Sequence, residues 1–332
     1  MPLQPLYPLT FEPILKSLIW GGRRLGSILH KAIGPGDRYA ESWEISDHRD
    51  DVSKVNAGPL KGTGLRDLIR ERGDDLLGKG RSRLKPQQFP LLVKFLDAND
   101  VLSVQVHPDD ELGPRLANDN GKTETWVIVH AEPGSLIYAG LKPGVTRERF
   151  AIMLDWGIVE PLLHRFEAKA GDCIMIPAGT VHAIGAGVVL AEIQQMSDAT
   201  FRVHDWGRVG PDGVPRQLHI AEALEATHFD EGPVSPLKVV AEELADGSGT
   251  RERLSRCDYF ALERIHLRGS TRIGADDRFT IVIGLGGEAD LCYHENRTRV
   301  KLGQTVLIPA SVGPCEVKPR SGEAILLTCI VP

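Results

Sequence analysis

Short apolar runs broken by Gly, Pro, Asn and Asp recur along the 332-residue chain. Examples are ETWVIVHAEPGSLIYAG, AGDCIMIPAGTVHAIGAG and VVLAEIQQMS. Runs of this length, separated by turn residues, are typical of β-strands and favour an all-β sandwich or barrel. Only a few stretches have helical periodicity, and these are residues 64–78, 107–116, 146–156 and 218–226. We therefore expect a mainly β fold with a few short helices.

One segment is echoed near the C-terminus. KAGDCIMIPAGTVHAIG, residues 169–185, resembles KLGQTVLIPASVGPCEV, residues 301–317. Both begin Lys-x-Gly and run through apolar residues to Ile-Pro-Ala, which predicts two copies of one β module. Chance similarity of two Gly-turn-strand-Pro segments is the alternative. The predicted division is 1–230, a catalytic module with helical insertions, and 231–332, a degenerate module in which Pro314 stands where the first copy has His182.

Composition and charge exclude several classes of function. With 42% apolar and 25% charged residues the chain is an ordinary globular protein, and a net charge of −6 argues against a nucleic-acid binder. No apolar run is long enough to span a membrane, and the first 13 residues do not resemble a secretory signal. The five cysteines form no CxxC pair, as expected for reduced thiols. We expect a cytoplasmic monomer or homodimer without nucleic-acid or membrane partners.

A polar pair interrupts the apolar run that ends in SVQVHPDDE. Gln105 and His107 are two residues apart, so in a β-strand both side chains point to the same face. Two polar groups on an inward face are costly unless they are satisfied. A buried hydrogen-bonded pair would satisfy them, and so would a metal ion.

Two other segments supply further polar groups. In GKTETWVIV, Lys122 and Glu124 alternate to one face just before a strong β run. The spacing from Gly171 through Pro177 and Gly179 to His182 resembles the second motif of the cupin superfamily, although the usual final Asn is replaced by Ala186. The turn would return His182 to the mouth of a barrel.

Four of these residues form a candidate metal site. One amide oxygen, one carboxylate and two imidazoles suit a borderline divalent cation, most plausibly one zinc ion per chain. Taken singly, each residue is better explained as a satisfied polar group of the core. The predicted ligands are Gln105, His107, Glu124 and His182.

Several motifs resemble the short bacterial form of the type I mannose-6-phosphate isomerases. These are QVHPDD, GKTETW, PAGTVHAIG and QQMSDATFRVHDWGR, and LIWGGRRLG and ESWEISDH are also similar to that family. The similarity extends over roughly residues 10–220. It implies two cupin-type jelly-roll modules, the same four zinc ligands, and interconversion of mannose 6-phosphate and fructose 6-phosphate. It also implies site roles for Arg202, Lys94, Lys122 and Glu192.

The implied reaction moves a proton between two carbons through an enediol. Negative charge on the sugar oxygens must be stabilised, for which Arg202 is suited, and a base must carry the proton. Glu192, Lys94 and Lys122 are the candidates for that base, and the sequence does not choose among them. A lysine beside the metal would have a lowered pKa. As alternatives, Arg202 would pair with Asp198 or Asp205 at the surface and Lys94 would extend its ammonium to water.

Two other functions remain open at this stage. A cupin metal oxygenase usually holds iron through a His-rich set, which the glutamine and the cluster of cations disfavour. A non-catalytic or regulatory sugar-binding cupin would keep the fold but could lose Glu124 or Arg202, and both are present.

Overall fold

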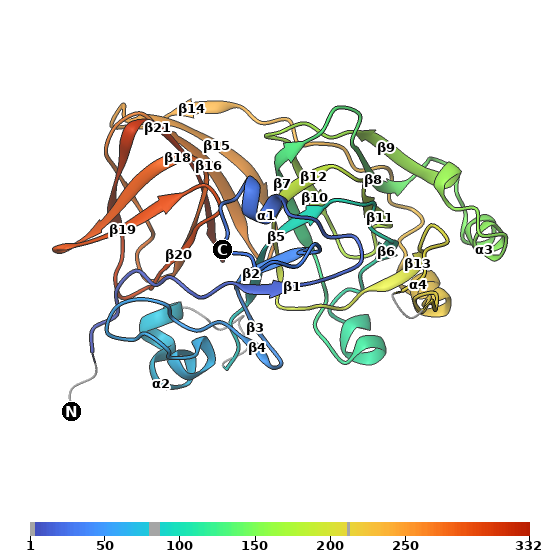
Figure 1. The fold of residues 1–332 in the computed structure, drawn as a ribbon, viewed down its shortest axis with the longest axis horizontal. Coiled ribbons are helices and arrows are strands. Elements are labelled where there is room, and N and C mark those ends of the chain that lie inside the picture. The colour runs from blue at the N-terminus through green and yellow to red at the C-terminus, as the bar shows by residue number, and fades with distance from the viewer. Residues whose placement is uncertain (1–3, 80–86, 211–212) are drawn as a thin grey trace.

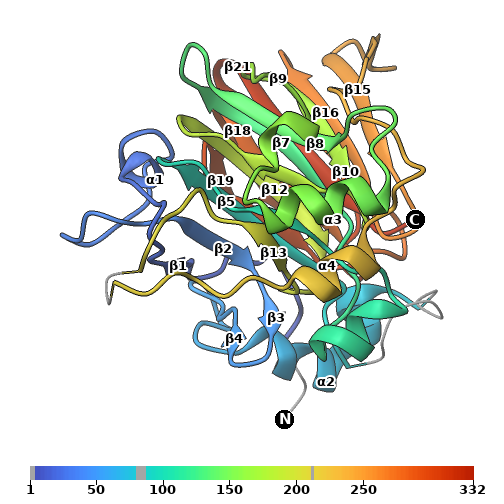
Figure 2. The same ribbon diagram turned by 90° about the vertical axis from the view of Figure 1, so that its right-hand side faces the viewer.

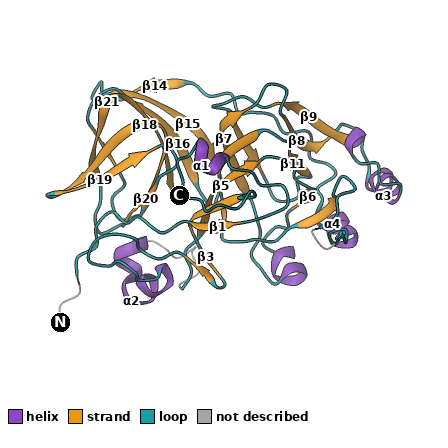
Figure 3. Cartoon of the chain, viewed as in Figure 1, coloured by secondary structure: helices purple, strands orange, loops and turns teal. Residues whose placement is uncertain are grey.

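The structure is a computed structural model that describes residues 4–79, 87–210 and 213–332 (Figure 1). Within these ranges the strands build three large sheets and one two-stranded hairpin, β3 (Asp47–His48) with β4 (Asp51–Val52). Helices are few and lie on the outside (Figure 3). The expected mainly β fold with a few short helices is confirmed.

The first sheet forms one wall of the N-terminal half. Its strand order is β1-β2-β5-β12-β7-β10, and its central strands β5 and β12 are buried along their whole lengths, as their apolar sequences predict. The strands are β1 (Ile14–Lys16), β2 (Glu41–Ile45), β5 (Leu91–Ala98), β12 (Val188–Gln195), β7 (Glu124–Ala131) and β10 (Cys173–Ile176).

The second sheet has the order β13-β6-β11-β8-β9. Every pairing in these two sheets is antiparallel, and strands close in space are often distant in sequence. The strands are β13 (Phe201–His204), β6 (Val104–Val106), β11 (His182–Ile184), β8 (Leu136–Leu141) and β9 (Leu163–Glu167).

The third sheet gathers the C-terminal strands at the other end of the molecule (Figure 1). Its order is β14-β15-β16-β21-β18-β19, with β17 paired to β21 and β20 paired to β18. The strands are β14 (Ala241–Glu243), β15 (Gly249–Arg256), β16 (Ala261–Leu267), β17 (Thr271–Ile273), β18 (Thr280–Tyr293), β19 (Asn296–Lys301), β20 (Thr305–Ile308) and β21 (Cys315–Ile330).

Four α-helices are present in the described ranges, together with a π-helix and a short 3-10 helix. α2 buries the apolar face that its sequence predicts, and Thr146 caps α3 by accepting a hydrogen bond from the Arg149 N–H at 3.2 Å. The expected helix at 107–116 is only a short π-helix. The helices are α1 (Arg24–Ser27), α2 (Leu65–Leu77), η1 (Gly113–Ala117), α3 (Arg147–Asp155), η2 (Glu160–Leu162) and α4 (Ile220–Ala226).

α3 and α4 lie at the end of the molecule that faces the viewer in Figure 2, away from the third sheet. The largest apolar core joins the two ends, because Phe89 beside the first sheet stacks at 4.9 Å between ring centroids on Phe279 beside the third. No helix among the described residues is long and apolar enough to cross a membrane.

The two echoed segments adopt similar local structures. β10 and β20 are both four-residue strands, and each ends at the residue before the proline of Ile-Pro-Ala. This likeness supports the interpretation of a repeated β module.

Candidate active site and metal centre

Three neighbouring strands of the first sheet present polar side chains in one row. Glu192 on β12 lies opposite Lys94 of β5 on one side and Trp126 of β7 on the other. The indole N–H of Trp126 donates a hydrogen bond to Glu192 Oε2 at 3.2 Å. Because paired residues of adjacent strands project to the same face, the register alone brings these three side chains together.

The second sheet presents a matching row. Gln105 on β6 lies opposite Arg202 of β13 and His182 of β11. The Gln105 amide reaches His182 Nε2 at 3.3 Å, and the hydroxyl of Ser103 donates to Gln105 Oε1 at 3.4 Å. The predicted face of the SVQVH segment is therefore the face that this row uses.

A polar cavity of about 360 Å³ opens between these rows. Carboxylates, ammonium groups and guanidiniums line it together with a few apolar side chains. The charged lining residues are Glu41, Lys94, Lys122, Glu124, Glu192, Asp198, Arg202 and Arg216.

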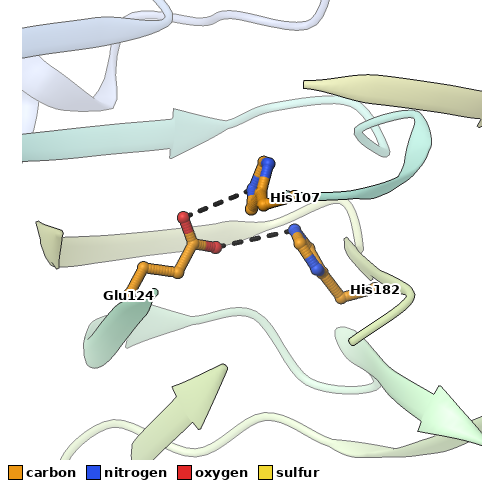
Figure 4. A group of neighbouring side chains, drawn as sticks. All are labelled: His107, Glu124 and His182. Carbon is orange, nitrogen blue, oxygen red and sulfur yellow. Dashed lines mark ion pairs between the residues drawn. The ribbon is translucent and has the colours of Figure 1, made fainter. Parts of the chain in front are cut away.

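His107, Glu124 and His182 converge beside this cavity, with one potential ligand atom of each within 4.8 Å of the others. His107 Nε2 lies 3.4 Å from Glu124 Oε2, and His182 Nε2 lies 3.5 Å from Glu124 Oε1. Figure 4 shows the two imidazoles pointing at the carboxylate from β11 and from the end of β6. All three side chains are buried.

The tautomers of the two imidazoles follow from their other nitrogens. His107 Nδ1 lies 2.8 Å from the carbonyl oxygen of Ala199, and His182 Nδ1 lies 2.9 Å from that of Thr180. A carbonyl only accepts, so both Nδ1 atoms carry the proton and both Nε2 atoms present lone pairs to the cluster. Such second contacts are typical of metal-binding histidines.

The charge states of the cluster suit a metal cation. Burial lowers the pKa of His107, and burial together with His107 lowers the pKa of His182 to about 3, so both rings are neutral. Burial alone would raise the pKa of Glu124, but Lys122 and the imidazoles outweigh it and hold that pKa well below its usual range. Two neutral imidazoles with Nε2 lone pairs and one ionised carboxylate, all aimed at one point, are in the protonation states that metal ligands need, so these residues fit a metal ion.

Lys122 and Gln105 complete the surroundings of the cluster. Lys122 Nζ lies 2.6 Å from Glu124 Oε2 and 2.8 Å from His107 Nε2, so an ammonium already lies against two of the predicted ligands. Gln105 turns its Nε2 toward His182, and rotating the amide by about 180° would present the oxygen that a cation needs. The structure thus brings all four predicted ligands together.

Lys94 lies among three carboxylates. Its Nζ is 3.5 Å from Glu41, 3.7 Å from Glu192 and 3.6 Å from Asp198. Burial disfavours the ammonium, but these carboxylates overcome that effect and raise the pKa of Lys94. The sequence predicted a lowered pKa for a lysine beside a bound metal, and the acidic neighbours of Lys94 act in the other direction. Lys94 does not extend to water, since its side chain is 4% exposed.

The surroundings of Glu192 favour its neutral form, whereas those of Lys94 favour the charged form. Burial, followed by the charge of Glu124, raises the pKa of Glu192 to about 7. Its Oε1 is buried and has no hydrogen-bond partner within the described ranges. A carboxylate with one unsatisfied oxygen on a cavity wall is a candidate for a group that contacts substrate.

Arg202 lies at the rim of the same cavity. Its Nε donates to the Ser103 hydroxyl at 3.2 Å and its Nη1 donates to the carbonyl of Gln217 at 2.9 Å. The two carboxylates considered as its surface partners are occupied by other cations, since Asp198 lies against Lys94 and Asp205 against Arg208 and Arg216.

Three charged cavity residues were not predicted from the sequence. Glu41 accepts a hydrogen bond from the Trp43 indole at 2.6 Å and lies against Lys94. Asp198 belongs to the Ser-Asp motif and Glu41 begins the ESWEISDH motif. Each motif could therefore have pointed to its acidic residue. Arg216 follows a loop rich in Gly and Pro, where no periodicity indicates which side chains turn inward.

Two family models match the chain. Residues 9–122 match the phosphomannose isomerase type I catalytic domain, and residues 250–328 match the mannose-6-phosphate isomerase cupin domain. The match to a cupin domain confirms the expected fold class of cupin-type modules.

Curated proteins and solved structures agree with these matches. The chain is 35% identical over 307 residues to mannose-6-phosphate isomerase ManA of Bacillus subtilis, covering 92% of this chain and 94% of that protein. It is 32% identical to the mannose-6-phosphate isomerase of Streptococcus mutans, covering 92% and 93%. The crystal structure of the Bacillus subtilis mannose 6-phosphate isomerase superposes with a TM-score of 0.88 at 30% identity, covering 98% of this chain and 99% of that one.

A mannose 6-phosphate isomerase bound with zinc and yttrium shares the fold, with a TM-score of 0.78 at 20% identity and coverage of 98% and 100% of the two chains. At that identity the likeness shows the fold alone. The identity to ManA, in contrast, extends over nearly the whole of both proteins. The chain therefore belongs to the type I mannose-6-phosphate isomerase family.

Proposed function

We propose that the chain interconverts mannose 6-phosphate and fructose 6-phosphate with one zinc ion bound to Gln105, His107, Glu124 and His182. The observation that carries the proposal is that two groups lie at one polar cavity. One is the cluster of His107, Glu124 and His182, which suits a cation, and the other is Glu192, whose pKa is near 7. An aldose–ketose isomerisation needs these two elements together.

The donor set favours zinc over other metals. Two neutral imidazoles are donors of intermediate softness, and the carboxylate and amide oxygens are harder donors; zinc accepts this mixed set readily. When bound, the ion would stabilise negative charge that develops on the sugar oxygens. Two imidazoles and one carboxylate also occur in non-heme iron oxygenases, so the amide of Gln105 as a fourth donor and the neighbouring Lys122 are the features that favour a zinc isomerase.

Glu192 is the proposed proton carrier. A base works best when its pKa is near the working pH, and the pKa of Glu192 is raised to about 7. The hydrogen bond from Trp126 holds Oε2, so Oε1 is the oxygen that would take the proton from one carbon and return it to its neighbour. Lys94 is poorly suited to this task, because its raised pKa keeps it protonated.

The remaining predicted residues would orient the substrate and neutralise negative charge. Lys94 as an ammonium would donate to a sugar oxygen and moderate the charge of Glu192, 3.7 Å away. Lys122 would stay beside Glu124 and donate to an oxygen near the metal. Arg202 has donors left after its bonds to Ser103 and Gln217, and one of them would stabilise the enediolate.

An assay of the purified chain tests the function directly. We expect conversion of mannose 6-phosphate to fructose 6-phosphate, loss of activity after chelation, and recovery with zinc. Glu124→Gln removes the one carboxylate of the cluster and should abolish both metal retention and turnover. A protein that binds the phosphosugar without turning it over would be a sugar-binding cupin, and a protein that retains iron instead of zinc would support the oxygenase.

The sequence expectation of a cytoplasmic protein accords with a metabolic role. All five cysteines are free, as in proteins of reducing compartments. We therefore propose a cytoplasmic location and a phosphosugar as the small-molecule partner.

A further inference from the structure

We propose that Arg216 binds the phosphate group of the substrate and so determines the preference for a phosphosugar over the free sugar. The inference rests on the proposed isomerase function and adds the residue that would anchor the end of the substrate remote from the reacting carbons. It starts from the uneven distribution of charge along the cavity wall.

The cavity residues around Lys94 and Lys122 are mainly acidic. Lys94 faces Glu41, Glu192 and Asp198, and Lys122 faces Glu124. Four carboxylates thus face two ammonium groups, so a divalent cation would neutralise this group and leave no excess positive charge for a phosphate dianion. Neither lysine is therefore a good phosphate anchor.

The arginines around Asp205 form a second, basic group. Arg216 and Arg208 share the single carboxylate of Asp205, and Arg202 lies close enough to both guanidiniums for their charges to lower its pKa after the larger effect of burial. Three guanidiniums thus surround one buried carboxylate, and the more exposed Asp100 lies 3.5 Å from Arg208. The excess positive charge calls for an anion, and the substrate provides one.

Arg216 is the member of this group that is positioned to receive the anion. Its Nε donates to Asp205 Oδ2 at 2.8 Å and its Nη2 donates to Oδ1, so the carboxylate holds the guanidinium by one edge. A guanidinium has five N–H donors, and Asp205 takes two of them. Because Arg216 also lines the cavity, its remaining donors are available for phosphate oxygens. A guanidinium binds phosphate well because two of its N–H groups can donate to two phosphate oxygens at once.

Arg202 is better placed for the reacting end of the substrate. Arg202 is the strand partner of the predicted ligand Gln105, whereas Arg216 lies in the segment that connects β13 to α4. A sugar phosphate extends its phosphate away from carbons 1 and 2, so a cavity arginine that is not paired with a predicted metal ligand is the expected anchor. Arg202 and Arg216 then divide the two negatively charged parts of the substrate between them.

The test compares Arg216→Gln with the matched control Arg208→Gln. Both changes remove one guanidinium from Asp205, but Arg208 is not among the described residues that line the cavity. We expect Arg216→Gln to lower kcat/KM for mannose 6-phosphate by about 10–100-fold, mainly through KM, and to leave kcat/KM for unphosphorylated mannose unchanged. Arg216→Lys should recover part of this loss. Arg208→Gln should change kcat/KM for mannose 6-phosphate by less than about threefold.

A binding measurement makes the test independent of turnover. Inorganic phosphate should raise the melting temperature of the wild-type protein and of Arg208→Gln, and should have little effect on Arg216→Gln. An unchanged KM together with an unchanged phosphate effect in Arg216→Gln would overturn the inference. Absence of isomerase activity in the wild type would instead refute the proposed function, and the phosphate measurement would still decide whether Arg216 binds the anion.

Discussion

At the scale of single residues, three buried side chains define what the site can bind. The backbone carbonyls of Ala199 and Thr180 fix the tautomers of His107 and His182, and burial keeps both rings neutral beside the ionised Glu124. This arrangement of one carboxylate and two Nε2 lone pairs attracts a cation. Removing one ligand should therefore affect the metal before it affects the fold.

Replacing His182 by Ala tests the ligand assignment. We expect the purified variant to contain little zinc and to have lost at least about 10²-fold in turnover, because each ligand of such a set contributes strongly to metal affinity and the metal stabilises the transition state. Elemental analysis and the isomerase assay measure both. His164→Ala is the control, since His164 on β9 contacts Ser235 and has no predicted metal role. Full zinc occupancy in His182→Ala would contradict the assignment.

Glu192 should set the acid limb of the pH profile. A base acts in its deprotonated form, so kcat/KM should fall about tenfold per pH unit below the pKa of Glu192, which is raised to about 7 by burial and by Glu124. A bound cation favours the carboxylate, so the limb of the zinc-loaded enzyme should lie at or below pH 7.

Glu192→Gln should lower kcat by about 10²–10⁴ and remove this limb, because the amide keeps the shape but cannot accept the proton. The zinc content and melting temperature of the variant serve as controls and should match the wild type. If the variant keeps the wild-type pH profile, one of the lysines must be considered as the base instead.

At the scale of elements, the turn between β10 and β11 positions His182. Gly179 has a φ of +86°, donates its N–H to the His107 carbonyl at 2.9 Å, and accepts from the His228 N–H at 3.0 Å. The turn thus ties the strand of one metal-site histidine to the backbone of the other. A side chain at Gly179 would meet the His228 ring, since its Cβ would lie 2.5 Å from that ring.

Gly179→Ala should therefore destabilise both the fold and the metal site. The left-handed backbone costs about 1–2 kcal/mol for a residue with a Cβ, and displacement of His228 adds to that cost. Gly144→Ala is the matched control, with a φ of +80° and nothing within 4 Å of the added Cβ. Urea unfolding should show the larger loss for Gly179→Ala, and only that variant should lose zinc. Equal losses in the two variants would show that the turn has no special role.

At the scale of the whole molecule, the first and third sheets share one apolar core. The largest cluster includes residues from β5 and β12 in the N-terminal half and from β16, β18 and β21 in the C-terminal half. We propose that the chain divides into modules near residue 230 and that the second module, 231–332, has a structural role. The third sheet would then support the first sheet from the side away from the cavity.

Phe279→Ala tests this support. Phe279 is 1% exposed and stacks on Phe89, so its truncation should cost about 3–5 kcal/mol of unfolding free energy and lower the melting temperature of the whole chain in a single transition. Lys318→Gln, an exposed change on β21, should leave stability and turnover near wild type. Two separate transitions in the variant would indicate modules that fold independently, and a loss of turnover in Lys318→Gln would contradict the structural role.

The sequence by itself determined the local features of this protein. Turn residues between short apolar runs predicted the strands, and the two-residue period of a strand placed Gln105 with His107 and Lys122 with Glu124. Fixed spacing from Gly171 to His182 identified the returning turn. These features depend only on residues a few positions apart in the chain, so the sequence alone specifies them.

Only the tertiary structure decided how distant residues act on one another. The antiparallel registers of β5 with β12 and of β6 with β13 brought Lys94 to Glu192 and Arg202 to Gln105, and loop closure turned Arg216 into the cavity. Our proposal of Glu192 rather than Lys94 as the base rests on burial and on the carboxylates around Lys94. A pKa depends on solvent exclusion and on charges a few ångströms away, and sequence distance encodes neither.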